Sequence, residues 1–353
     1  MKSATQGLVA AACLPLITGI SFADETTVDG QEVLEAFGTS QAEIRRLEAG
    51  EVVNFDASEF ENSKRELATD ATVLVNQPLP VVLTKLTSSA SLVPSRKILA
   101  SGDLDGDEGD FSGVSFDDSE KDNKEVDRLF KAKPGSDFNF SKEEWEWVKG
   151  FLKDVDRSDQ AAKREAAAKA LQHILRGRYK AYRAAGIDGI APVQRGSKKF
   201  IDVGNDLRLT TETHEPMAQW FPEYYNVLMN YPEGADCCEH IYRWMKVKIA
   251  KRPTFALTHS IIEKTDDSLL YTERLYYLNN AGNYGQVLLG WVPYGEGTYM
   301  GLAMSANTGV LDTLLGKMLR SLGRDMAGDL IGEVLLDIKT DLESGEDMGE
   351  IGE

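Results

Sequence analysis

The densest group of chemically active side chains is the segment SGDLDGDEGDFSG, residues 101–113. Its five acids within eight positions are Asp103, Asp105, Asp107, Glu108 and Asp110. Spaced acids are typical of calcium loops, which also need glycine at position 6 and a bidentate glutamate at position 12. Counted from Asp103, these positions hold Glu108 and Val114. The pattern therefore favours a solvated acidic turn over a weak calcium site.

A histidine on an apolar strand is the second candidate. In TFALTHSIIEK, residues 254–264, a strand period of two puts His259 on one face with Phe255, Leu257 and Ile261. An imidazole among apolar side chains must be hydrogen-bonded or face a cavity. His259 is thus either a structural histidine of the core or a residue that orients a polar ligand group or transfers a proton.

The next strand-like run, residues 268–280, offers a partner for this histidine. Alternation groups Glu273 with Tyr271 and Tyr277 and places Arg274 on the opposite face. Glu273 is therefore the expected acid beside the imidazole. The predicted ligand-binding residues are His259, Glu273, Phe255, Leu257, Tyr271 and Tyr277.

Metal and cofactor motifs are missing from the sequence. No two histidines are three or four positions apart, and HExxH, CxxC, GxSxG and phosphate-loop patterns do not occur. We therefore expect neither a metal nor a cofactor. Beyond residue 23 the cysteines are the adjacent Cys237 and Cys238, which can close a vicinal ring, link to another chain or stay free.

The first 23 residues have the pattern of a secretory signal peptide. Lys2 precedes an apolar stretch at residues 7–20, and Ser21 and Ala23 provide small residues for cleavage after Ala23. The apolar stretch is too short for a bilayer-spanning helix, and no later stretch approaches that length. The sequence predicts a periplasmic or secreted protein without an integral membrane span.

Charge narrows the expected partners. The chain has 353 residues, a formal net charge of −18 and a 42% hydrophobic fraction, which is enough for a sizeable core. Such a negative charge disfavours nucleic acid and anionic lipid surfaces as partners. The sequence leaves the oligomeric state open.

The remaining segments predict an α+β chain with one domain over residues 51–342. A polar, partly helical lead at 24–50 precedes strands at 51–55 and 64–76 and a helix from Pro80. A helical insertion at about 100–235 contains a capping box at Ser141 and Glu144 and an alanine-rich helix at 158–185. Residues 187–216 are predicted to be irregular, 217–232 to contain a short helix, and 343–353 to form a disordered acidic tail.

The C-terminal third is the most regular part of the pattern. Five strand-like runs at 240–250, 254–264, 268–280, 284–294 and 298–307 are separated by short turns, which predicts an antiparallel meander. A long amphipathic helix at about 310–342 follows, with four interior glycines that indicate a kink or close approach to the sheet. We expect a curved antiparallel sheet that grips this helix.

This order of elements resembles the START-like helix-grip fold over residues 51–86 and 240–342. The resemblance implies an apolar cavity between the sheet and the last helix. An ordinary α+β domain with a filled core is the alternative.

Four segments resemble a family of exported bacterial proteins of unassigned function. They are FSGVSFDDSEKDNKEVDRLFKAKPGSDFNFS, YKAYRAAGIDGIAPV, YPEGADCCEHIYRWMKVKIAKRPTFALTH and NTGVLDTLLG. Where that family tends to carry a cysteine pair in the PGSDFNF element, this chain has Ser136 and Asn139. The resemblance implies an exported protein and assigns no chemistry.

Together these features predict an exported protein that binds an apolar, lipid-like or amphipathic small molecule in a sheet–helix cavity. An enzyme that uses a His259–Glu273 acid–base pair in that cavity is one alternative. A cell-envelope interaction protein is the other, and a large exposed apolar patch would favour it.

Overall fold

An eight-stranded antiparallel sheet is the centre of this α+β fold, in a computed structural model that describes residues 28–55, 57–88, 98–312 and 314–344. The strand order is β1-β2-β10-β9-β8-β7-β6-β3. The strands are β1 Val53–Phe55, β2 Glu66–Val75, β3 Ile98–Asp103, β6 Glu239–Ile249, β7 Arg252–Lys264, β8 Leu269–Leu278, β9 Tyr284–Tyr294 and β10 Gly297–Asn307.

The five-stranded meander β6–β10 is confirmed, with strand ends close to the predicted ones. Short turns join its strands, and Ala250, Lys251, Ala281 and Gly295 adopt the positive φ angles that such tight reversals require. The register of β7 with β8 shifts once, between Leu257 and Thr258. This bulge changes which face the following residues of β8 occupy.

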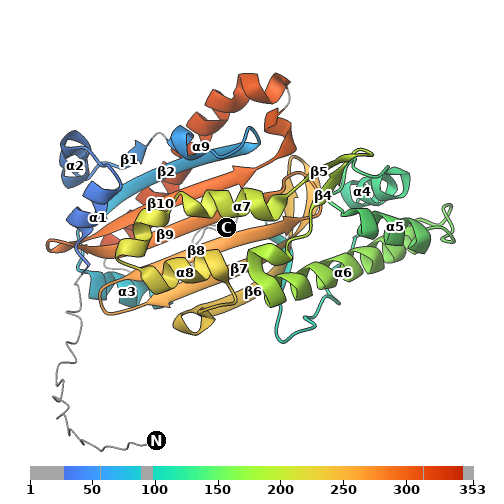
Figure 1. The fold of residues 1–353 in the computed structure, drawn as a ribbon, viewed down its shortest axis with the longest axis horizontal. Helices are drawn as coiled ribbons and strands as arrows, with labels where there is room; N and C mark the ends of the chain where they lie inside the picture. The colour runs from blue at the N-terminus through green and yellow to red at the C-terminus, as the bar shows by residue number, and fades with distance from the viewer. Residues whose placement is uncertain (1–27, 56, 89–97, 313, 345–353) are drawn as a thin grey trace, which may run out of the picture.

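The helical insertion covers one face of the sheet, which we call the insertion face. Its helices are α4 Glu120–Lys131, α5 Lys142–Phe151, α6 Gln160–Ala185, α7 Val203–Glu212 and α8 Pro222–Asn230. In Figure 1, α6, α7 and α8 lie on the near side of the sheet. The capping box at Ser141 and Glu144 is confirmed, and α6 ends at Gly186, whose φ is 55°. Apolar side chains of α6 and α8 form one core cluster with those of β6–β9.

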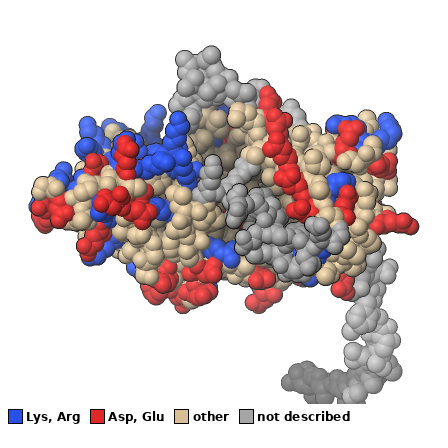
Figure 2. Space-filling model, turned by 180° about the vertical axis from the view of Figure 1, so that it is seen from behind, with Lys and Arg blue, Asp and Glu red and all other residues tan. Residues whose placement is uncertain are grey.

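The C-terminal helix packs on the opposite face of the sheet. Helix α9, Leu314–Glu343, buries Ile331, Leu335, Ile338 and Leu342 against β2, β10 and α3, Leu79–Ser88. Close approach to the sheet does not require its glycines, because a Cβ at Gly328 would lie 3.6 Å from Thr69 Oγ1 and one at Gly332 would lie 3.7 Å from Asn54 Oδ1, which are ordinary contacts. The exposed side of α9 carries acids four positions apart, and Figure 2 shows acidic side chains in a row on this face. These acids are Asp325, Asp329, Glu333 and Asp337.

Two short N-terminal helices lie where β9 turns into β10. Helix α1, Gly30–Ala36, and helix α2, Gln41–Glu48, begin at the caps Asp29 and Ser40. A Cβ at Gly30 would lie only 2.5 Å from the carbonyl oxygen of Pro293. Glycine therefore lets α1 press directly on β9, which places the residues after α1 beside the insertion face.

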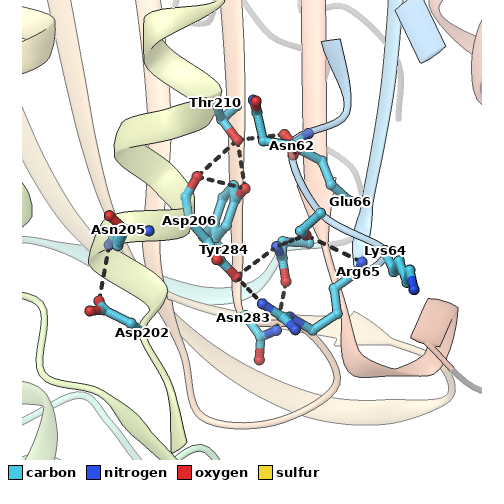
Figure 3. A network of polar contacts seen from close by, with 12 residues as sticks. Asn62, Lys64, Arg65, Glu66, Asp202, Asn205, Asp206, Thr210, Asn283 and Tyr284 are labelled. Carbon is cyan, nitrogen blue, oxygen red and sulfur yellow. Dashed lines mark hydrogen bonds and ion pairs between the residues drawn. The ribbon is translucent and has the colours of Figure 1, made fainter. Parts of the chain in front are cut away.

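A polar network fixes α7 to the sheet (Figure 3). Arg65 pairs with Asp206 at 2.7 Å, and the hydroxyl of Thr210 donates to the buried carboxylate of Glu66. Tyr284 of β9 lies 2.6 Å from the same hydroxyl. Burial raises the pKa of Glu66. We call these five residues the α7 latch; it holds the helix that leads directly into residues 213–221.

Several predicted boundaries change in the insertion. Residues 187–216 are partly regular, because they contain β4 Val193–Arg195, β5 Lys199–Ile201 and α7. Neither strand β3 nor helix α4 was predicted from the sequence. Strand β3 lacks a strand-like pattern, since it consists largely of small and polar residues. Gly102 of β3 lies against the indole of Trp244, where a Cβ would be 2.5 Å from Nε1. Close packing on β6, not strand propensity, therefore defines this strand.

The predicted termini fall partly outside the described residues. The signal peptide at 1–23 lies wholly outside them, as do residues 345–353 of the predicted tail. The last helix begins at Leu314 after a short 3₁₀ turn, Gly309–Asp312, and reaches Glu343. Among the described residues, no helix has the length and apolar character needed to cross a bilayer.

Candidate functional site

His259 lies in the core of the insertion face. Its relative exposure is 0%, and β7 holds it among Tyr182 of α6, Tyr231 and Tyr242. The predicted grouping with Phe255, Leu257 and Ile261 is confirmed, because all three belong to the same apolar cluster. The α9 cluster is on the other face. His259 therefore does not line a cavity beneath the C-terminal helix, and that expectation is wrong.

Both ring nitrogens of His259 are engaged. Nδ1 lies 3.0 Å from the hydroxyl of Tyr182, and Nε2 lies 2.8 Å from Nδ1 of His240. Nε2 of His240 lies 2.8 Å from the carbonyl oxygen of Ala235. A carbonyl only accepts, so His240 donates there and accepts from His259, which in turn accepts from Tyr182. We call Arg274, Tyr182, His259 and His240 the histidine chain.

The histidine chain is uncharged at its two imidazoles. Burial lowers the pKa of His259 far below its usual range, and nearby His240 and Arg274 lower it further. Burial also lowers the pKa of His240. Neutral rings fit the donor order, in which every ring nitrogen already has one partner. No imidazole nitrogen of the histidine chain is therefore free to bind a substrate, and we interpret these residues as a structural element.

Arg274, not Glu273, shares the face of His259. The register pairs His259 directly with Arg274, and directly paired residues point to the same side of a sheet. The Arg274 guanidinium is buried and donates to Tyr182, to Gln286 Oε1 at 2.9 Å and to the Leu228 carbonyl at 2.9 Å. The predicted His259–Glu273 pair is therefore wrong.

The other predicted residues divide between the two faces. Tyr271 belongs to the α9 cluster and donates to Glu273 at 2.7 Å. Tyr277 moves to the insertion face because of the bulge in β7–β8 pairing, and the Arg178 guanidinium lies 4.8 Å from its ring centre. Phe255 is fully buried beside Phe116. None of these residues lines the pocket described next.

An apolar pocket of about 130 Å³ opens on the insertion face at the β2 side of the sheet. Its floor consists of small residues on neighbouring strands. Gly290 of β9 pairs with Gly301 of β10, and Ala303 pairs with Asp70 of β2. Because Gly290, Gly301 and Ala303 have little or no side chain, the space above them stays open and forms the pocket.

Segments far apart in the sequence form the walls and roof of this pocket. The α7 latch positions residues 213–221, and α1 and α8 complete the cover. Phe37 at the rim is 42% exposed, so the pocket reaches the surface there. The lining is Val33, Phe37, Thr39, Phe55, Asp70, Ala71, His214, Met217, Phe221, Tyr224, Leu270, Leu288, Leu289, Gly290, Val292, Tyr299, Gly301, Leu302 and Ala303.

Asp70 is the unusual member of this lining. No described residue donates a hydrogen bond to its carboxylate, although the side chain is shielded by the pocket walls. Desolvation raises its pKa to about 7, with no opposing contribution from a donor or a cation. An acid without a partner in an apolar lining is costly unless something else binds it.

His214 is the second titratable group of the pocket. It precedes the 3₁₀ turn Glu215–Gln219 and is half-buried. Desolvation lowers its pKa to about 4, so the imidazole is neutral at physiological pH. The pocket therefore combines an apolar surface with a neutral imidazole and a carboxyl group that titrates near neutrality.

Cys237 and Cys238 close a vicinal disulfide, which is one of the three alternatives that the sequence left open. Their sulfurs and a carboxylate oxygen of Glu263 lie within 4.8 Å of one another. It is the one such group of three potential ligands in the described part of the chain. In the disulfide, neither sulfur is a thiolate, so the group does not form a metal site in this state.

The acidic loop at residues 103–110 is tied to its neighbours. Asp103 pairs with Arg243, Glu108 pairs with Lys180, and Asp110 accepts from the backbone nitrogen of Ser112. The Tyr179 hydroxyl lies 2.7 Å from the Gly106 carbonyl oxygen. These contacts support a turn that docks on α6 and β6.

The pocket could not be identified from the predicted site. One signal was present in the sequence, because Asp70 lies in the middle of the strand ELATDATVLV, whose other residues on that face are Glu66 at its start, Ala68, Thr72 and Leu74. Glycines inside two neighbouring strands, Gly290 and Gly301, were the other signal. No family model, curated protein or solved structure matches the chain.

Proposed function

We propose that this protein binds a small, largely apolar molecule in the pocket above Gly290, Gly301 and Ala303. The single observation that carries the proposal is the floor of residues with little or no side chain in the middle of a sheet, covered by aromatic and aliphatic residues. Cores are normally packed without such space. Side chains could fill this site, and in this chain they do not.

The size and lining of the pocket support a compact ligand. An apolar protein cavity of about 150 Å³ is large enough for benzene. The pocket measures about 130 Å³, and aromatic residues such as Phe221, Tyr224 and Tyr299 line it. A single ring or a short branched alkyl group fits this volume, and a long lipid chain does not.

The proposal places the ligand on a different face from the one that the helix-grip resemblance implies. Between α9 and the sheet, the described side chains form an apolar cluster that includes Val73, Met300 and Leu335. The pocket instead lies under α1, α8 and residues 213–221. The proposal therefore keeps a small apolar or amphipathic ligand, leaves out a long lipid-like one, and changes the residues that bind the ligand.

Filling the floor tests this proposal. In Gly290→Val, the new Cβ would lie 3.5 Å from Leu270 Cδ2, which is an ordinary contact, and the methyl groups would enter the pocket. Toluene is a suitable probe. Its binding is measured by ligand-observed NMR, as a change in the toluene signal that saturates with concentration. We expect saturable binding to the unmodified protein and at least about tenfold weaker binding to the variant, which corresponds to about 1.4 kcal/mol.

Gly285→Val provides the matched control. Gly285 lies on the same strand outside the pocket, and a Cβ there has ordinary contacts at 3.8 and 3.9 Å. Toluene should bind this variant as it binds the unmodified protein. The proposal is wrong if toluene does not bind saturably, or if both valine variants weaken binding equally.

A further inference from the structure

We propose that the ligand carries a protonated amine and that the carboxylate of Asp70 binds it. This inference rests on the proposed function, because it assigns the polar group of the same ligand. It starts from an unmatched acceptor. Asp70 pairs with Ala303 across the β2–β10 ladder, so its side chain stands at the edge of the small-residue floor.

The described lining offers Asp70 no cationic partner. The lining contains neither lysine nor arginine. Its one basic side chain among the described residues is His214, whose imidazole is neutral. Other titratable groups are the phenols of Tyr224 and Tyr299, whose pKa values burial raises, so both remain uncharged. Asp70 is consequently the one group in the described lining that can carry charge at neutral pH.

None of the polar groups in the described lining donates to Asp70, and both phenols have other hydrogen-bond partners. The Tyr224 hydroxyl lies 2.7 Å from the hydroxyl of Thr272 and 3.2 Å from the Ile261 carbonyl oxygen. The Tyr299 hydroxyl has the side chain of Thr72 as its hydrogen-bond partner. A donor for the carboxylate must therefore come from a molecule that enters the pocket.

Aromatic rings make a cation a better donor than a neutral group. Phe37, Phe55 and Phe221 line the pocket with Asp70. The faces of aromatic rings attract ammonium groups, and a desolvated carboxylate binds a cationic donor more strongly than a neutral one. A carboxylate ligand is disfavoured, because Asp70 and a net charge of −18 both repel it.

Three probes of similar shape test the inference on the intact protein: benzylamine, benzyl alcohol and benzoate. At about pH 8, where Asp70 is ionised, we expect the affinity for benzylamine to be at least about tenfold higher than the affinity for benzyl alcohol. Benzoate should bind most weakly. In Asp70→Asn the preference for the amine should fall below about twofold, while benzyl alcohol still binds.

Glu273→Gln is the matched control, since it removes a strand carboxylate on the other face of the sheet. It should leave the amine preference unchanged. The unmodified protein provides a second measurement that needs no variant. Because Asp70 must lose its proton to pair with the ammonium, benzylamine should bind more tightly as the pH rises from about 5.5 to 8 and benzyl alcohol should not.

The outcomes separate the inference from the proposed function. Binding of toluene and benzyl alcohol without a preference for benzylamine overturns the inference and leaves the proposed function standing. An amine preference that persists in Asp70→Asn also overturns it. If no aromatic probe binds saturably at any pH, both the inference and the proposed function are wrong.

Discussion

The histidine chain and the pocket lie on the same face of one sheet, and each contains a histidine and other titratable groups. In the histidine chain, every imidazole nitrogen has a partner within 3.0 Å. In the pocket, Asp70 has no donor among the described residues, and desolvation is the sole cause of the pKa shifts of Asp70 and His214. Burial of a titratable group is therefore a weaker sign of function than a missing partner.

This difference has a physical basis. A buried polar group costs little when its hydrogen bonds are satisfied, and a closed set of hydrogen bonds specifies one arrangement of the core. Such a set has no capacity left for a ligand. A polar group that faces space without a partner retains that capacity, as Asp70 does. The comparison predicts separate effects on stability and on binding.

Breaking the histidine chain should give the largest loss of stability. His259→Ala leaves the Tyr182 hydroxyl and His240 without their partners and opens a cavity in the core. We expect the free energy of unfolding to fall by about 3–5 kcal/mol, measured by urea denaturation. Toluene affinity of the protein that remains folded should change by less than about twofold. A loss of stability below about 1 kcal/mol would contradict the structural interpretation.

The pocket groups should instead appear in the pH dependence of stability. The pKa of Asp70 is about 7 in the folded state and 3.8 for an ordinary aspartate, so the folded state holds the extra proton between these two pH values. Ionised Asp70 therefore destabilises the fold as the pH rises from about 4 to 7. Asp70→Asn should match the unmodified protein near pH 4 and exceed it at pH 8 by at most about 4 kcal/mol, at about 1.4 kcal/mol per pKa unit.

His214→Gln should show the opposite trend in the same urea titrations. The pKa of His214 is about 4 in the folded state and 6.5 for an ordinary histidine, so protonation opposes folding as the pH falls through this range. This variant should match the unmodified protein at pH 8 and exceed it near pH 4 by at most about 3 kcal/mol. Parallel pH profiles for the two variants would show that the two groups are not desolvated as described.

The acidic loop should give the smallest effect. Three of its acids are paired or hydrogen-bonded within the protein, so the loop resembles the histidine chain more than the pocket. Calcium at millimolar concentration should leave the melting temperature unchanged within about 1 °C, because the acidic loop does not present a preformed set of calcium ligands. A calcium-dependent rise that disappears in the triple variant D103N/D105N/D107N would overturn this prediction.

The sequence predicted the meander and the last helix well because their patterns are local. Period-two alternation over residues 240–307 and helical periodicity before Leu342 depend on neighbours within each element. The START-like grip, the exported family and the signal peptide stay predictions. Strand β3 could not be predicted, since it depends on the fit of Gly102 against Trp244, far along the chain.

The prediction of the site residues was wrong at one step, which was the pairing of β7 with β8. Alternation correctly separated Glu273 from Arg274, but it could not show which of them faces His259 until the register of β7 with β8 was known. A shift by one residue exchanges the faces of a strand. The bulge at Leu257 and Thr258 also moves Tyr277, which no periodic pattern anticipates.

The pairing of β2 with β10 also sets the order in which the molecule can be completed. Asp70 and Ala303 face each other in this ladder, and Thr72 donates to the carbonyl of Met300 across 228 positions. Such distant contacts form slowly, because the intervening chain must first be confined. During synthesis, β2 cannot pair with β10 until this last strand has left the ribosome. We therefore expect the floor of the pocket to form late in folding, and a truncated chain that lacks β10 cannot contain Gly301 or Ala303.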